Sequence, residues 1–225
     1  MSAVKRISTV AKYIPNVFYI NTSKYDEFVY LDYLAGVFAN NNEFSVLLSS
    51  DEILYQSLNS HLVALNIKGL NTKLITDKNV IAYLAEQETA PFTNKLLNVV
   101  LSVTGSKDYT IDGLKNVKFK KSVKMVSDLI SSGKLSDTYN YACPKEALKC
   151  SPNLAEDIDK IEANYKAIYP IEILSNEMSN IKLDVDVAIK TKPQVTYNQF
   201  DELNSRIFLQ FPLNIASILK GEIDK

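Results

Sequence analysis

Cys143 and Cys150 are the only cysteines of the 225-residue chain, and their types and spacing most resemble a chemical site. A structural zinc site needs four ligands, whereas the chain offers these two thiols and one distant histidine, His61. Pro144 favours a helix with Cys143 at its N-cap, which would separate the two cysteines by about 10 Å, too far for a disulfide. We therefore expect no metal and no disulfide. We also expect the helix N-terminus and Lys145 to lower the pKa of Cys143, with Cys150 as a small apolar filler.

Hydroxyl and carboxylate residues follow each of three expected strands. In open parallel sheets, ligands bind beyond the carboxyl ends of the strands, where helix N-termini offer free N–H groups. These junctions could bind a phosphate or, through their aspartates, a divalent cation, although the same residue types also cap helices. The candidate ligand-binding residues are Ser23, Ser49, Ser50, Asp51, Thr76 and Asp77.

A second candidate site is a cluster of lysines around Phe119, the nearest approach in this chain to a nucleic-acid patch. Its members are Lys115, Lys118, Lys120, Lys121 and Lys124. A solvated lysine-rich edge that discourages strand pairing explains the same residues. Because 26 acidic residues face 25 basic ones, the chain supplies no overall positive field, so nucleic acid is a possible but not a favoured partner.

A third pair, Asp184 and Asp186, stands two residues apart in the segment 182–190, where apolar and polar residues alternate. That alternation predicts a half-buried strand, and paired carboxylates can hold a metal or transfer protons. Lys182 and Lys190 would share the same strand face, and such a mixed-charge row is typical of a solvated surface. We therefore assign no catalytic residue, no metal and no cofactor.

The elements that must position these residues alternate between strand and helix in the first part of the chain. This order predicts right-handed crossovers and an α/β fold, with an N-terminal parallel βαβ sheet flanked by helices. The expected strands are 16–22, 43–50 and 71–76, and the expected helices are 24–41, 51–69 and 78–88.

Beyond this core, the segment 92–103 fits a helix or a buried strand, and we favour the helix. Asp112 and Gly113 predict a hairpin turn, and residues 120–133 a helix that ends at Gly133. Ser151 and Pro152 predict the start of a helix over 152–169, with an apolar seam from Leu154 to Ile168. The expected organisation is an α/β body, 1–133, with its core at 16–90, then a joint, 134–150, and a mixed, mainly helical C-terminal part, 151–225, with one strand at 182–190.

Composition excludes several classes of protein. The chain has only six glycines, which argues against a glycine-rich loop that binds phosphate. It has a single histidine, which excludes most catalytic triads. No apolar run reaches the 18 to 20 residues that span a bilayer, and the N-terminus lacks the apolar core of a secretory signal. We therefore expect a protein that is neither secreted nor in a membrane, located in the cytoplasm or inside a viral particle.

The first functional hypothesis is a non-catalytic structural or assembly protein, for example a phage or viral component, that acts through protein partners or self-association. Thirteen tyrosines and nine phenylalanines agree with interfaces but also with a core. The alternatives are an enzyme or small-ligand protein that uses the strand ends, and a nucleic-acid accessory factor that uses the lysine cluster.

Overall fold

The computed structural model describes Phe18, Ile20 and residues 25–66, 73–107, 109–137, 142–169 and 175–190. The chain divides into two compact units, residues 25–178 and residues 1–24 together with 179–225. Of the described elements, only α10 (Met178–Lys190) lies mainly in the second unit. The predicted joint, 134–150, falls inside the first unit.

A three-stranded mixed sheet is formed by β1 (Ser45–Leu48), β2 (Leu62–Asn66) and β3 (Lys73–Ile75) in the order β1-β2-β3. β1 and β2 are parallel, whereas β3 is antiparallel to β2. A parallel connection needs about a dozen residues or more. Residues 49–61 provide that length between β1 and β2, but residues 67–72 between β2 and β3 do not.

The fold is therefore mixed α/β, but the predicted βαβαβ order is not found. Residues 51–69, predicted as one helix, form the 3-10 helix η1 (Ile53–Ser57) and then β2. Asn59 explains the break, because its side-chain oxygen accepts hydrogen bonds from the backbone N–H groups of His61 at 2.8 Å and Leu62 at 3.0 Å. Such an Asx turn reverses the chain where a helix would have continued.

The strands predicted at 43–50 and 71–76 are confirmed as β1 and β3. The strand predicted at 16–22 falls largely outside the described residues; Phe18 and Ile20, which are described, are in no strand.

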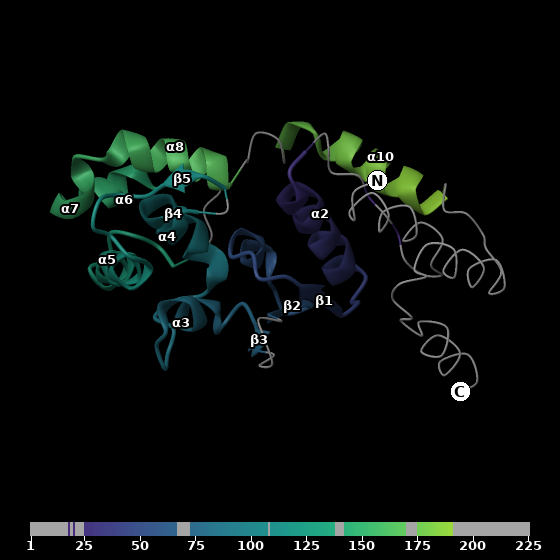
Figure 1. Ribbon diagram of the computed structural model, residues 1–225, viewed down its shortest axis with the longest axis horizontal. Coiled ribbons are helices and arrows are strands. Elements are labelled where there is room, and N and C mark those ends of the chain that lie inside the picture. Colours follow the sequence, from purple (N-terminus) through teal and green to yellow (C-terminus); the bar gives the residue numbers. More distant parts are fainter. Residues whose placement is uncertain are drawn as a thin grey trace, which may run out of the picture. The chain divides into compact units, whose positions relative to one another are not determined.

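Helix α2 (Glu27–Asn40) confirms the helix predicted at 24–41. Asp26 caps it by accepting a hydrogen bond from the Phe28 N–H at 2.9 Å. Phe28, Val29, Tyr30 and Ala35 are buried on the inner side of the helix. α2 packs on β2 and η1, so it covers one face of the sheet (Figure 1).

The core of the larger unit is α4 (Leu97–Thr104), in which every residue from Leu97 to Val103 is buried. It confirms the helix favoured for 92–103 and is preceded by η2 (Asn94–Leu96). It lies between α5 (Phe119–Ser131) and α8 (Ile158–Ile168), as Figure 1 shows. The Asn98 side chain donates to the Tyr165 hydroxyl at 2.9 Å inside this contact. Tyrosines such as Tyr55, Tyr165 and Tyr169 are buried, so part of the high tyrosine content belongs to the core.

The hairpin predicted around Asp112 and Gly113 is displaced. β4 (Gly105–Ser106) pairs antiparallel with β5 (Ile111–Asp112), so the turn precedes β5 instead of following it. Gly113 is required for a different reason, since a Cβ atom there would lie 2.0 Å from the Thr104 carbonyl oxygen. The helix predicted at 120–133 is confirmed as α5, with Gly133 at φ +68° directly after it.

Short helices connect α5 to α8, namely α6 (Lys145–Lys149) and α7 (Pro152–Ala155), while α3 (Val80–Ala85) contacts α5. The helix predicted over 152–169 is divided into α7 and α8, and its apolar seam packs inside the unit. None of the helices in the described ranges is long and apolar enough to cross a membrane.

The strand predicted at 182–190 is wrong, because these residues belong to α10. A helix satisfies its own backbone hydrogen bonds, whereas a strand needs a neighbouring strand, and none pairs with this segment in the described part of the chain. The alternating sequence places apolar residues on two sides of the helix. Ile181 and Val185 are buried, while Leu183 and Val187 are exposed.

Candidate functional site

The strand-end residues after β1 form a local hydrogen-bonded turn. The Asp51 N–H donates to the Ser49 hydroxyl at 3.0 Å, and Asp51 Oδ1 accepts from the Ile53 N–H at 2.9 Å. Asp51 Oδ2 accepts from the Tyr109 hydroxyl at 2.8 Å. Both carboxylate oxygens therefore have partners, and the group fixes the start of η1 and the position of Tyr109.

The chain leaves β3 in the direction opposite to that in which it leaves β1. Because β3 is antiparallel to β2, its last residue, Ile75, pairs with Ala64, whereas Leu48 at the end of β1 pairs with Leu65. The predicted convergence of Ser49, Ser50 and Asp51 with Thr76 and Asp77 is not found. Ser23 lies outside the described residues.

Thr76 and Asp77 have local roles at the start of α3. The Thr76 N–H donates to the Asn79 side chain at 2.8 Å, and the Asp77 carbonyl accepts from the Asn94 N–H at 3.0 Å. These contacts hold the turn that leads from β3 into α3.

A small cavity of about 270 Å³ lies beside Tyr109, lined also by Asp26, Phe28, Ile53 and Lys166. Burial raises the pKa of Asp26, with smaller contributions from Glu27 and Asp51. Burial, the hydrogen bond to Asp51 and nearby carboxylates also raise the pKa of Tyr109. Across the described ranges, no group of three or more potential ligands could hold a metal ion.

Asp184 and Asp186 do not share a face as predicted. On helix α10, residues two apart point in widely different directions, so the two carboxylates cannot act as a pair.

The two cysteines are free thiols. The predicted lowering of the Cys143 pKa is wrong, because burial and the Glu162 carboxylate raise the pKa of this thiol to about 11. Pro144, not Cys143, is the N-cap of α6. Cys150 is exposed instead of acting as an apolar filler, and its thiol donates to the Glu146 carbonyl at 3.4 Å.

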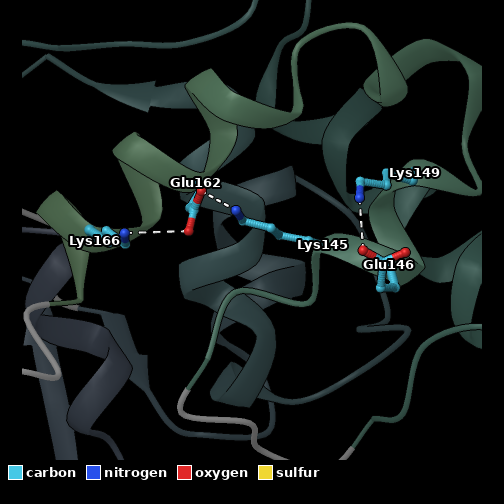
Figure 2. A network of polar contacts seen from close by, with 5 residues as sticks. All are labelled: Lys145, Glu146, Lys149, Glu162 and Lys166. Atoms are coloured by element: carbon cyan, nitrogen blue, oxygen red, sulfur yellow. Dashed lines mark hydrogen bonds and ion pairs between the residues drawn. The ribbon is translucent and has the colours of Figure 1, made fainter.

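An ion-pair network beside Cys143 joins α6 to α8. Glu162 lies between Lys145 and Lys166 in Figure 2, paired with Lys145 and, at 3.3 Å, with Lys166. The hydrogen bond from Lys145 is the largest cause of the lowered Glu162 pKa. Because Lys145 is already paired with Glu162, its charge does not compensate for the burial of the Cys143 thiol.

The lysine cluster is the predicted site that the structure assembles best. Its members are exposed, and an open groove of about 820 Å³ lies between α5 and the segment after α3. Four of the five predicted lysines line this groove, namely Lys118, Lys120, Lys121 and Lys124.

The sheet has an apolar face that the sequence pattern did not predict. Side chains of paired residues point to the same side of a sheet, so Leu48, Leu65 and Leu74 form a row across the three strands. Val46 lies on the same face, because it is two residues from Leu48. Val46 is 49%, Leu48 64% and Leu74 57% exposed. Apolar and polar residues do not alternate in the segment 43–50, and such a pattern predicts a strand that is covered on both faces. The pattern therefore does not indicate that one face of this strand is exposed.

Comparison of the chain with protein families, with curated proteins and with solved structures finds no match. The functional argument therefore rests on the chain's own geometry.

Proposed function

We propose that the protein is a non-catalytic assembly protein that associates with a second copy of itself through the outer edge of β1. Val46 and Leu48 of this strand belong, with Leu65 and Leu74, to one sheet face, here called the open face. The observation that supports this proposal most directly is the row of Leu48, Leu65 and Leu74 across the sheet, in which Leu48 and Leu74 are more than half exposed. Contiguous exposed apolar surface is the usual mark of a protein interface.

The edge of β1 offers the second half of such an interface. The Ser45 N–H donates to the His61 carbonyl next to β2, so alternation turns the N–H groups of Val46 and Leu48 toward the outer edge. Within the described residues, no strand pairs with that edge. Unpaired strand edges readily accept another strand.

The composition of β1 favours a neutral strand as its partner. Ser45–Leu48 contains no charge and no proline, the residues that commonly protect an edge, whereas β3 at the opposite edge begins with Lys73. A second β1 is such a neutral strand, and two-fold pairing uses the same surface on both copies.

An antiparallel β1 pair centred on Leu47 would place Val46 opposite Leu48 of the second copy. Both side chains would remain on the open face, so Val46 and Leu48 of each copy would pack beside those of the other along the seam. Cross-strand apolar pairs of this kind typically contribute about 0.2 to 1 kcal/mol each.

Light scattering on size-separated protein tests this proposal through a matched pair of variants. Leu48→Lys adds a charge at a site that is 64% exposed, and Leu183→Lys adds the same charge on α10 at a site that is 58% exposed. We expect the wild type and Leu183→Lys to have the mass of two chains, and Leu48→Lys that of one. A monomeric wild type, or loss of the dimer only in Leu183→Lys, would rule the interface out.

A further inference from the structure

We propose that the groove lined by Lys118, Lys120, Lys121 and Lys124, here called the basic groove, binds the phosphodiester backbone of a nucleic acid. This goes beyond self-association, because the groove is formed by α5 and the segment after α3, and the open face is formed by the sheet.

The lysines of α5 lie on the side of the helix that faces away from the core. Val123, Met125, Val126 and Leu129 are buried against the core, which turns the lysines outward. Lys120 and Lys124 are four residues apart and therefore lie on the same helix face, one turn from each other. The outward face of the first two turns of α5 is therefore uniformly basic.

The lysines at the start of α5 destabilise the helix locally. A helix N-terminus carries a partial positive charge that favours acidic residues, yet Lys118 is the N-cap of α5 and the first turn has no acidic residue. Like charges at Lys120 and Lys124 also destabilise a helix. Sequences usually violate such local rules where function requires it, and a bound phosphate would neutralise both effects.

Within the described residues, none of these lysines pairs with an acidic side chain. In the described part of the chain, ion pairs within 4.0 Å are found only among residues of α6 and α8. Asp128, one turn after Lys124, makes none with it. The ammonium groups are therefore available to a ligand.

The remaining lining of the basic groove distinguishes nucleic acid from an acidic protein. Gln87, Thr89 and Asn116 add uncharged polar groups, and none of the described lining residues is acidic or aromatic. Protein interfaces are depleted of lysine and enriched in aromatic residues and arginine, whereas lysine commonly binds phosphate as a point charge. Without an aromatic platform for stacking, recognition would depend on the backbone and not on the bases.

The test compares two quadruple variants of the full chain that carry the same net charge. The groove variant is K118Q/K120Q/K121Q/K124Q, and the control is K78Q/K95Q/K107Q/K134Q, which changes exposed lysines outside the groove. The probe is a fluorescently labelled single-stranded oligonucleotide of mixed sequence, followed by anisotropy over a salt series. Circular dichroism verifies that both variants are folded.

We expect the wild type and the control to bind, and the groove variant to lose affinity by about tenfold or more at low salt. The slope of log affinity against log salt should decrease by about 0.7 for each lysine that contacts phosphate. Three results would overturn the proposal: no oligonucleotide binding by the wild type at low salt, equal losses in both variants, or equally tight binding of polyglutamate, which would indicate an acidic protein partner.

Discussion

Leu48 and Leu74 lie on the same face of the three-stranded sheet, on opposite sides of Leu65, and both are more than half exposed. The opposite face is covered by α2, with Ile75 and Ala64 fully buried. The sheet thus has one face in the core of its own unit and a second, apolar face on which Val46, Leu48 and Leu74 are exposed, while Val63, the partner of Val46, is buried. This asymmetry is the basis of the proposed self-association.

Two glycine substitutions test how closely the backbone at Gly113 approaches the backbone at Thr104. We expect Gly113→Ala to lower the free energy of unfolding by about 2 kcal/mol or more, because its Cβ would lie 2.0 Å from a backbone oxygen. Gly36→Ala is the control: it lies inside α2 with no atom within 4 Å of the added Cβ, so a gain of about 1 kcal/mol is expected. Urea unfolding measures the stability of both variants. If Gly113→Ala were as stable as the wild type, the close approach of Gly113 to Thr104 would be refuted.

Thiol chemistry tests the environment of Cys143. Because burial and Glu162 raise its pKa to about 11, little thiolate exists at pH 8. In a Cys150→Ser background, we expect iodoacetamide to label Cys143 at least about tenfold more slowly than a free cysteine peptide. The labelling rate should keep increasing with pH beyond 9. Labelling as fast as the peptide, with a plateau near pH 9, would contradict the burial.

Asn94 connects η2 to the end of η1, and replacing its side chain should destabilise the folded protein. Its side-chain amide donates to the carbonyl oxygens of Tyr55, Gln56 and Leu58 at 3.2, 3.0 and 2.7 Å. Asn94→Ala would leave these carbonyls without that donor, so we expect a loss of about 1 to 3 kcal/mol in the free energy of unfolding. Asn153→Ala, at an exposed position in α7, is the control for an asparagine substitution. Equal urea midpoints for the two variants would count against the structural role of Asn94.

Alkaline pH should destabilise the protein through Tyr55. Burial raises the pKa of Tyr55 to about 12, above the value of about 10 expected in the unfolded chain. A raised folded-state pKa gives stability that is complete below pH 10 and is lost as pH increases through about 12. In urea titrations, we expect the midpoint of the wild type to fall over this range more steeply than that of Tyr55→Phe. Parallel curves for the two proteins would show that Tyr55 does not contribute.

Sequence periodicity predicted the elements whose local signals agreed with their burial. α2, α4 and α5 were found where apolar spacing predicted helices. The prediction was wrong for 51–69, where helical spacing outweighed the turn signal of Asn59, and for 182–190, where alternation on its own did not make a strand. In both cases, the deciding factor was how the backbone hydrogen bonds were satisfied, which periodicity does not record.

The candidate sites differed in how well the sequence predicted them, and the reason is related. The lysines of the basic groove are close in sequence and lie on one helix, so their proximity could be predicted. The predicted convergence of Asp51 with Asp77 depended on a β3 parallel to β1, and the antiparallel pairing directs the chain after β3 the opposite way. The open face depends on what does not pack against the sheet, and a sequence pattern cannot show that absence.

Hydrogen exchange at single amides of β1 is the most direct test of the proposed assembly. Val46 and Leu48 direct their N–H groups to the outer edge, whereas alternation directs that of Leu47 toward β2. We predict that the Val46 and Leu48 amides are protected at high protein concentration and lose protection on dilution, while Leu47 stays protected throughout. Unprotected Val46 and Leu48 amides at every concentration would contradict β1 pairing between two copies of the chain.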